Sequence, residues 1–586
     1  MFDPRIYRAA LLPAVAAFVL LMFSLEPVPS VLPAPVSAPT FDGTEATRTA
    51  RSIVVLAPDR EPGSAGDLAV ADLVRERFAS IEGGEVSTQD YESTFRGEDV
   101  SLRNVLLTLP GGSERTILVV AHRDSAEGPG AATSAAATAE LLGLADNLGG
   151  SRHARTIILA STDGGSDGAT GVRELIESLP RPDDIDEALV ISQPGARGAE
   201  PPFVVAAGVD PDSPAPQLVQ TARAGAAREF EQRDPSPGPW IGLSRLAVPF
   251  GLGEQAALRG EGIEALALSS AGERQVDLER DQTVAPASLA ASGNAMLELI
   301  LTLDEAERPP AAGPDEYIRL GDNLIPGWTL SLLSITLLLP ALLAAADTWL
   351  REYRADWRSR RSLPWTAERA LLPLAALVLA YVLGIVGLVP DPVYPYDPGL
   401  FPAGVEAPIA FVALAAAVAL AALLVRPLRT PLDVEPHALA AAAGLLTSFA
   451  LLGIWLLNPY LALLLTPAAH VWLLPARAAG PPRAALVVLV SLVALVPAIA
   501  AFATVSSQLD LGLSAPWHLL LLIEDGQIGL EMSLLWCVMV GGLIGCVAAA
   551  ASGRGKTKPP LPPVLGSSSH PGPGSLGSSP PALRGR

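Results

Sequence analysis

Long apolar runs divide the chain into two kinds of region. One run covers residues 9–25, directly after Arg5 and Arg8. Seven more follow residue 320, and each is long enough, or nearly so, for a spanning helix of about 20 residues. They cover 324–346, 370–389, 404–425, 438–457, 460–476, 484–505 and 528–551. The pattern predicts a multi-pass membrane protein with one large polar region between the first two runs.

The first apolar run has the basic start of a signal peptide or a signal anchor. Val36-Ser37-Ala38 resembles a cleavage site, but it lies far from the apolar run and Pro39 follows it. We therefore expect an uncleaved anchor.

Basic residues predict the orientation, because cytoplasmic loops of membrane proteins are enriched in Lys and Arg. The connection 347–369 carries six arginines, whereas 390–403 and 506–527 carry no Lys or Arg. We expect eight spans in the plasma membrane, with both termini in the cytoplasm and residues 26–322 outside it. The run at 460–476 is the shortest. The expected parts are an anchor at 1–25, a Pro-rich linker at 26–45, an extracytoplasmic domain at 46–310, a seven-helix region at 324–551 and a disordered tail at 552–586.

Within the polar region, short apolar stretches alternate with helical patterns. Strands are predicted at 53–57, 103–109, 116–121, 156–161, 188–192, 203–207 and 263–268. Helices are predicted at 65–79, 134–147, 168–178, 214–229 and 287–303. This alternation indicates an α/β fold, a three-layer sandwich with a mostly parallel sheet. Reactive groups in such folds follow the carboxyl ends of strands, where His122, Asp124 and Asp163 stand.

Composition narrows the possible chemistry. The net charge is −21, and most acidic residues lie between 40 and 320, which argues against nucleic-acid binding. Both cysteines, Cys537 and Cys546, fall in a late apolar run, so the polar region has no disulfide and no cysteine-based zinc site. Its only histidines are His122 and His153. Basic residues are nearly all Arg, which hints at a GC-rich bacterial genome.

Five short blocks in the polar region carry a family resemblance. They are Arg60-Glu-Pro-Gly63-Ser64, Asn104-Val105-Leu106 with Leu109-Pro110-Gly111, Ala121-His122-Arg123-Asp124-Ser125, Asp163-Gly164, and Gly262-Ile263-Glu264-Ala265-Leu266. In this order and spacing, residues 50–300 resemble the bimetallic aminopeptidases of the family-28 metallopeptidases. The resemblance implies a zinc-exopeptidase fold.

The resemblance also implies where the active site would lie. His122 matches a metal ligand, and Asp124 matches the carboxylate that orients it. The positions of the remaining ligands and of the general base hold other residues. The bridging acid would fall in 130–134, the base and its neighbouring ligand at Gly165 and Ser166, a further acid near Ser192, and the last histidine at Gln255, after Glu254.

A two-metal hydrolase needs several ligands for each ion and a separate general base. We therefore expect no bound metal and no cofactor. His122, Asp124 and Asp163 would be the remnant of a cleft, with His122 and Asp124 a hydrogen-bonded pair that fixes a loop. The alternative is a rebuilt zinc site made by His122, Asp163 and Asp167.

Three functions remain open. The first is a non-catalytic peptidase-like domain that binds a peptide or protein partner in the cell envelope. Its layout is similar to that of the peptidase-like subunit of GPI transamidase. The second is an active membrane-anchored zinc aminopeptidase with a rearranged site. The third is a transport or lipid-handling protein in which the apolar spans do the work.

Overall fold

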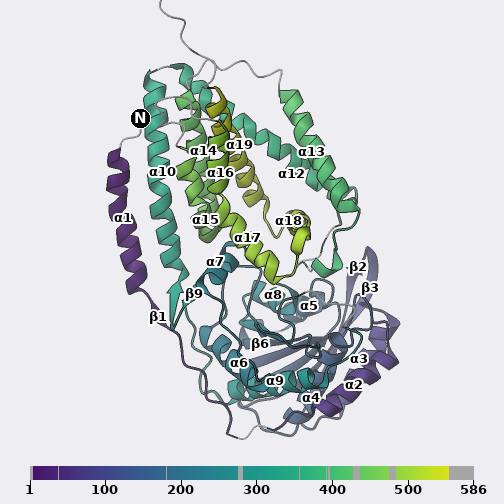
Figure 1. The fold of residues 1–586 in the computed structure, drawn as a ribbon. Helices are drawn as coiled ribbons and strands as arrows, with labels where there is room; N and C mark the ends of the chain where they lie inside the picture. The colour runs from purple at the N-terminus through teal and green to yellow at the C-terminus, as the bar shows by residue number, and fades with distance from the viewer. Residues whose placement is uncertain are drawn as a thin grey trace, which may run out of the picture.

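The computed structural model describes residues 4–36, 39–179, 181–274, 281–355, 357–390, 392, 396, 398–425, 436–473 and 484–552. The predicted disordered tail after Ser552 and part of the possible cleavage site lie outside these residues, whereas Ser552 itself ends a helix. A bundle of long helices stands on an α/β domain (Figure 1). The α/β domain is formed by the middle of the polar region.

Seven strands form the central sheet of the α/β domain, in the order β2-β3-β5-β4-β6-β8-β7. The four strands β5, β4, β6 and β8 run parallel, and β3 and β7 run antiparallel to them at the two sides. The edge strand β2 pairs antiparallel with β3. The sheet is therefore mixed, with a parallel centre. The strands are β2 (Glu85–Phe95), β3 (Glu98–Leu109), β4 (Thr116–His122), β5 (Thr156–Thr162), β6 (Ile185–Ser192), β7 (Val204–Val205) and β8 (Ala265–Ser269).

Helices cover both faces of this sheet, which confirms the three-layer sandwich. Alternate residues of β4 enter opposite layers: Ile117 and Val119 join one buried cluster, and Leu118 and Val120 join the other. The first cluster includes α2 (Gly43–Leu56), α3 (Ala65–Ala79), α4 (Ser134–Leu148), α6 (Pro216–Glu229) and α9 (Pro286–Glu305). The second includes α5 (Thr170–Ser178) and α8 (Gly253–Gly260).

The strand predicted at 53–57 is wrong, because these residues complete helix α2. Its buried residues include Ala46, Ala50 and Ile53, which recur at helical spacing and pack into the first cluster. Asp42 caps the helix by accepting hydrogen bonds from the backbone N–H groups of Thr44 and Glu45. The last turn contains Ile53, Val54 and Val55, and such a short β-branched run, taken alone, is typical of a strand.

The bundle contains fewer long helices than the eight spans predicted. Among the described residues, six helices are long and apolar enough to cross a membrane. They lie within α1 (Pro4–Phe23), α10 (Gly327–Ala355), the segment ending in α12 (Leu371–Ile385), α13 (Glu406–Val425), α14 (Pro436–Leu457) and α19 (Leu530–Ser552). The pair α16 (Ala484–Val493) and α17 (Val496–Gln508) is bent by 48° and would make a seventh. Helix α15 (Pro459–Val471), in the run at 460–476, has 13 residues and rises only about 20 Å, less than a bilayer core.

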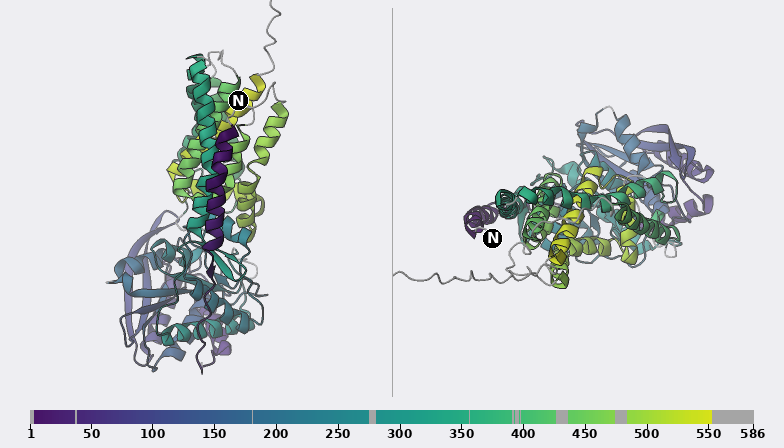
Figure 2. Two further views of the ribbon diagram at one scale, coloured as in Figure 1. Left: turned by 90° about the vertical axis from the view of Figure 1, so that its left-hand side faces the viewer. Right: turned by 90° about the horizontal axis from the view of Figure 1, so that it is seen from above.

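Domain and bundle meet at several places, among them a small sheet and helix α7 (Pro239–Ala247). A small sheet of β1 (Glu26–Pro27), β10 (Asn323–Pro326) and β9 (Tyr317–Leu320) joins the lower ends of α1 and α10, which lie side by side (Figure 2). Helix α7 packs on α15 and α17. There, Trp240 Nε1 donates to Thr504 Oγ1 at 3.0 Å, and Arg245 Nε donates to Gln508 Oε1 at 2.8 Å.

Candidate functional site

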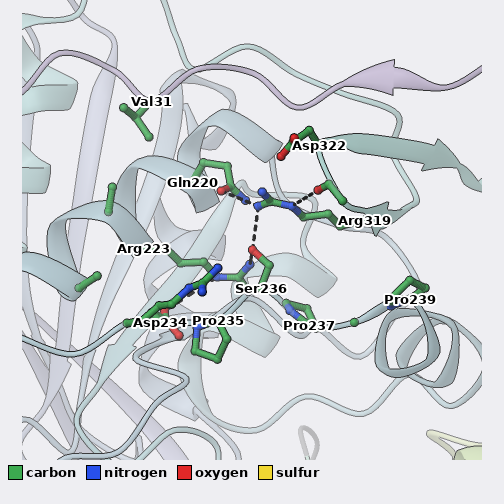
Figure 3. A pocket seen from close by; sticks show the side chains of 15 residues that line it. Val31, Gln220, Arg223, Asp234, Pro235, Ser236, Pro237, Pro239, Arg319 and Asp322 are labelled. Atoms are coloured by element: carbon green, nitrogen blue, oxygen red, sulfur yellow. Dashed lines mark hydrogen bonds and ion pairs between the residues drawn. The ribbon is translucent and has the colours of Figure 1, made fainter.

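A cleft lies at the carboxyl ends of the central strands, where the sequence predicts it. Its cavity measures about 210 Å³. Gly399 and Leu400, from η4 (Pro398–Leu400) in the helical region, form part of its wall. The lining residues from the domain include His122, Asp124, Gly165, Ser166, Ser192, Gln193, Gln255 and Asp281. A larger cavity of about 520 Å³ shares none of its lining residues with the cleft (Figure 3).

His122 ends strand β4 and turns toward helix α8. Its Nδ1 lies 3.5 Å from Oε2 of Glu254, which is buried and also accepts a hydrogen bond from Thr162 Oγ1. Burial alone would lower the pKa of His122, but the close approach and negative charge of Glu254 outweigh it and raise that pKa to about 9. The raised pKa favours the protonated imidazole at neutral pH, so a metal ion that binds His122 would have to displace this proton.

Gly165 makes this position of His122 possible. A Cβ built on Gly165 would lie 2.1 Å from His122 Cβ and 2.6 Å from His122 Cγ, far inside contact distance. The resemblance places the base and its neighbouring ligand at residues 165 and 166. Here the imidazole packs directly against the bare backbone of residue 165, so a carboxylate side chain has no room there while His122 keeps its position.

Asp124 holds the turn that contains Gly165. Its two carboxylate oxygens accept hydrogen bonds from the backbone N–H groups of Gly165 and Ser166, both at 2.9 Å, and the Ser166 hydroxyl adds a third. The expected His122–Asp124 pair is thus replaced by two separate contacts, because Glu254 takes the histidine and the turn takes the aspartate. Asp124 fixes the turn without His122, by accepting hydrogen bonds from the backbone of Gly165 and Ser166.

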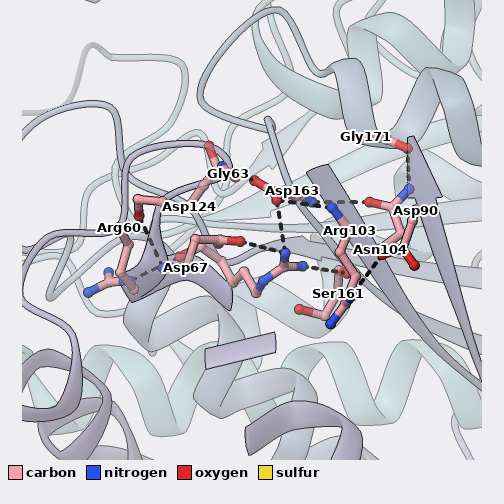
Figure 4. A network of polar contacts seen from close by, with 12 residues as sticks. Arg60, Gly63, Asp67, Asp90, Arg103, Asn104, Asp124, Ser161, Asp163 and Gly171 are labelled. Atoms are coloured by element: carbon pink, nitrogen blue, oxygen red, sulfur yellow. Dashed lines mark hydrogen bonds and ion pairs between the residues drawn. The ribbon is translucent and has the colours of Figure 1, made fainter. Parts of the chain in front are cut away.

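Asp163 lies outside the cleft, which corrects its placement beside His122 and Asp124. It belongs to a buried network in which Arg123 Nη2 contacts Asp67 Oδ2 at 2.6 Å and Asp163 Oδ2 at 3.1 Å (Figure 4). All three side chains are fully buried. Asp163 Oδ2 also accepts a hydrogen bond from the backbone N–H of Arg103. Its side chain therefore joins β3, α3 and β4 instead of facing a ligand.

The sequence did not reveal the role of Asp281. Its Oδ1 accepts hydrogen bonds from the backbone N–H groups of Ala132 and Thr133 at 2.7 and 3.0 Å, and its Oδ2 accepts one from Thr133 Oγ1 at 2.9 Å. A carboxylate thus reaches the segment where the resemblance places the bridging acid, but it comes from another part of the chain. Nearly 150 residues separate the partners, and nothing in the local pattern marks them.

The residues present do not fit a two-zinc centre. In the part of the chain that the structure describes, no group of three or more His, Cys, Asp or Glu side chains is arranged to hold a metal ion. The rebuilt site of His122, Asp163 and Asp167 is not assembled, because Asp163 is bound to Arg123. Burial and the nearby Asp124 raise the pKa of Asp167 to about 6, and it does not line the cleft.

Comparison with known proteins agrees with this fold. The model of Peptidase family M28 matches residues 104–234. The chain therefore contains an M28-like domain of the zinc-exopeptidase fold, followed by a helical region with several apolar helices. No curated protein sequence matches the chain.

Solved structures similar to the domain include enzymes of two kinds. A glutaminyl cyclase from an Acidobacteriales bacterium is 17% identical, with 47% of this chain and 99% of that chain covered and a TM-score of 0.37. The glutaminyl cyclase of Porphyromonas gingivalis is 18% identical, with 45% and 99% covered and a TM-score of 0.38. A zinc aminopeptidase from Bacillus subtilis is 11% identical, with 48% and 99% covered and a TM-score of 0.38.

The His122–Glu254 contact predicts a specific pH dependence. His122 has a raised pKa in the folded protein, so its contribution to stability is complete below about pH 6.5 and is lost as the pH rises through about 9.

Glu254→Gln should return the pKa of His122 to its ordinary value of about 6.5 or lower. Modification of His122 by diethyl pyrocarbonate, which attacks neutral imidazole, should then reach half its maximum at least one pH unit lower than in the wild type. His153 in the same protein is the control, because it contacts Asp304 and should keep its profile. An unchanged His122 profile in the variant would contradict the assignment.

Proposed function

We propose that this multi-pass membrane protein uses its M28-like domain to bind a peptide or protein segment in the cell envelope without cleaving it. The observation that carries the proposal is the packing of His122 against Gly165. In this arrangement His122 fills the space that a catalytic base at residue 165 would need, and its imidazole faces Glu254. Catalysis of the M28 type would need both residues in other roles.

The cleft itself is retained, and its lining suits a polypeptide. Ser166, Ser192, Gln193 and Gln255 bring hydroxyl and amide groups to its walls. Such groups can both donate and accept hydrogen bonds, as the N–H and C=O groups of an extended peptide require. The positive-inside pattern of the connections supports placing this domain outside the cytoplasm.

The wall contributed by Gly399 and Leu400 supports a role at the membrane. It brings a segment of the helical region to the edge of the binding cleft. A segment bound in this cleft would contact both parts of the protein. Binding there suits an assembly or recognition role of the kind that the sequence left open.

The proposal is tested with the full chain purified in detergent. We expect substoichiometric zinc by elemental analysis, no turnover of aminopeptidase substrates with added zinc or cobalt, and no change on His122→Ala. Fluorescent tetrapeptides should bind to the wild type and lose at least about tenfold in affinity, or about 1.4 kcal/mol, on Ser192→Trp, which fills the cavity. Ser178→Trp, at the end of α5 and away from the cleft, is the matched control.

Two results would overturn the proposal. Stoichiometric zinc, or turnover that His122→Ala abolishes, would establish the active hydrolase instead. Equal peptide affinity in the wild type, Ser192→Trp and Ser178→Trp would remove the cleft as the binding site.

A further inference from the structure

The cavity of about 520 Å³ lies at a different place from the cleft. It is bordered by helix α6, the connection that leads into α7, and the turn between β9 and β10 (Figure 3). Three arginines, Arg223, Arg233 and Arg319, contribute to its lining. Their positions on three separate elements show that the fold, and not one basic stretch of sequence, brings them together.

Two of these guanidinium groups converge on one serine. Arg319 Nη1 donates to Ser236 Oγ and Gln220 Oε1, both at 2.7 Å, and Arg223 Nη1 donates to Ser236 Oγ at 3.2 Å. The Nε of Arg319 is held by the backbone carbonyl of Gly321 at 2.9 Å. These contacts are to neutral groups, so they fix the orientation of the guanidinium groups but do not themselves compensate their charge.

The nearby carboxylates compensate this charge only in part. Asp234 Oδ2 lies 3.9 Å from Arg223 Nε, at the limit of an ion pair, and accepts a hydrogen bond from the backbone N–H of Val204. Arg223 Nε is buried and has no hydrogen-bond partner among the described residues. Asp322 is the second acid of the lining, against three arginines.

Helix α7 adds a positive end to the same cavity. Its N-cap is Gly238, which provides no side chain to cap the helix, and Pro239 follows. The first N–H groups of a helix carry partial positive charge and bind anions well. Pro239 itself has no N–H group, so the helix adds the positive end of its dipole to the charge of the arginines and no hydrogen bond from that residue.

The cavity also lies at the level where the domain meets the bundle. Trp240, the residue after Pro239, is 41% exposed, and Trp328, at the start of α10, is 53% exposed. Tryptophan is enriched at the boundary between lipid and water. Because α7 packs on α17 and β10 leads directly into α10, this boundary passes beside the cavity.

An adjoining cavity of about 400 Å³ extends the site with apolar surface. It shares Arg223, Ser236 and Arg319 with the first cavity, and Leu246 and Phe250 line its other part. Charged and apolar walls in direct succession suit an amphipathic molecule better than a free inorganic ion.

We propose that the Arg223–Arg233–Arg319 cavity binds a phosphate-bearing anion and that its source is the headgroup of an anionic phospholipid. Guanidinium groups match phosphate oxygens through paired, charge-assisted hydrogen bonds. The arginine cavity shares no lining residue with the cleft beside His122, so the proposal stands whether or not that cleft binds a peptide.

The test uses the full chain in detergent, titrated with phosphatidylglycerol or phosphatidylcholine and followed by native mass spectrometry. The wild type should prefer phosphatidylglycerol, and Arg223→Gln or Arg319→Gln should weaken its binding about tenfold, since each removes charge-assisted hydrogen bonds. Arg233→Gln should weaken the binding of phosphatidylglycerol about threefold. No described contact holds Arg233, so this variant should fold normally and tests the site even if the other two variants fold poorly. Arg228→Gln is the matched control: Arg228 lies on α6 but pairs with Glu298 outside the cavity.

Inorganic phosphate distinguishes the two sources of the anion. If phosphate raises the melting temperature of the wild type but not of Arg223→Gln, and phosphatidylglycerol is not preferred, the anion site stands and its lipid source is overturned. Equal binding of both lipids with no effect of phosphate would overturn the whole proposal. So would an equal loss of binding in Arg228→Gln and in the cavity variants.

Discussion

Replacement of Arg123 by methionine should destabilise the α/β domain by about 3–5 kcal/mol, because it removes one partner from a buried ionic network. Arg123 lies between the carboxylates of Asp67 and Asp163, and all three side chains are fully buried. Without the guanidinium group, two carboxylates would share an apolar space. Thermal or denaturant unfolding of the full chain, monitored in the domain, measures the loss.

The pH dependence of this variant has a defined sign. Burial already raises the pKa of Asp67 and of Asp163, and Arg123 opposes that rise. With Arg123 removed, the folded state should bind protons more readily than the unfolded state, so stability should fall as the pH rises. We therefore expect the variant to lose less stability relative to the wild type at pH 5 than at pH 8.

A surface ion pair provides the control for Arg123. Arg77 contacts Asp146 at 2.7 Å, but both side chains are more than 40% exposed. Arg77→Met should cost no more than about 1 kcal/mol, the range of exposed pairs. Equal losses for Arg77→Met and Arg123→Met would show that the buried network does not hold the domain together.

Local patterns were sufficient for most elements of the domain. Helix α3 occupies 65–79 as predicted, since Ser64 caps it and its apolar spacing is regular. Strands β4 and β5 are continuous apolar runs because both faces of a central parallel strand are buried. Strand β2 was missed, because this antiparallel edge strand is largely polar and exposed.

The site was predictable in position but not in its contacts. The order of the motifs located His122 and Asp124 at the ends of strands. It could not show that Glu254 would pair with His122 or that Arg123 would hold Asp163, since those partners come from distant segments. The approach of Asp281 to residues 132 and 133 has the same origin. Such contacts depend on how the strands and helices pack, and one sequence does not encode them in any local pattern.

Gly165→Ala should be the second large effect, with a loss of about 1–3 kcal/mol or more, because the new methyl group overpacks a filled site. The added Cβ would lie 2.1 Å from His122 Cβ. His122 would have to move, and its contact with Glu254 would break. Chemical denaturation measures the stability, and the pH profile of His122 modification reports the contact.

The loss of stability caused by Gly165→Ala should depend on the side chain of His122. In a double-mutant cycle, Gly165→Ala should be much less harmful on a His122→Gly background, with a coupling of about 1–3 kcal/mol. Gly225→Ala is the matched control, because a Cβ there meets no atom closer than 4.0 Å and alanine favours the interior of helix α6. Simple additivity of Gly165→Ala and His122→Gly would mean that the two residues do not compete for space. The expected coupling would instead show that His122, which matches a metal ligand, and a side chain at position 165, where the resemblance places the base, compete for the same space.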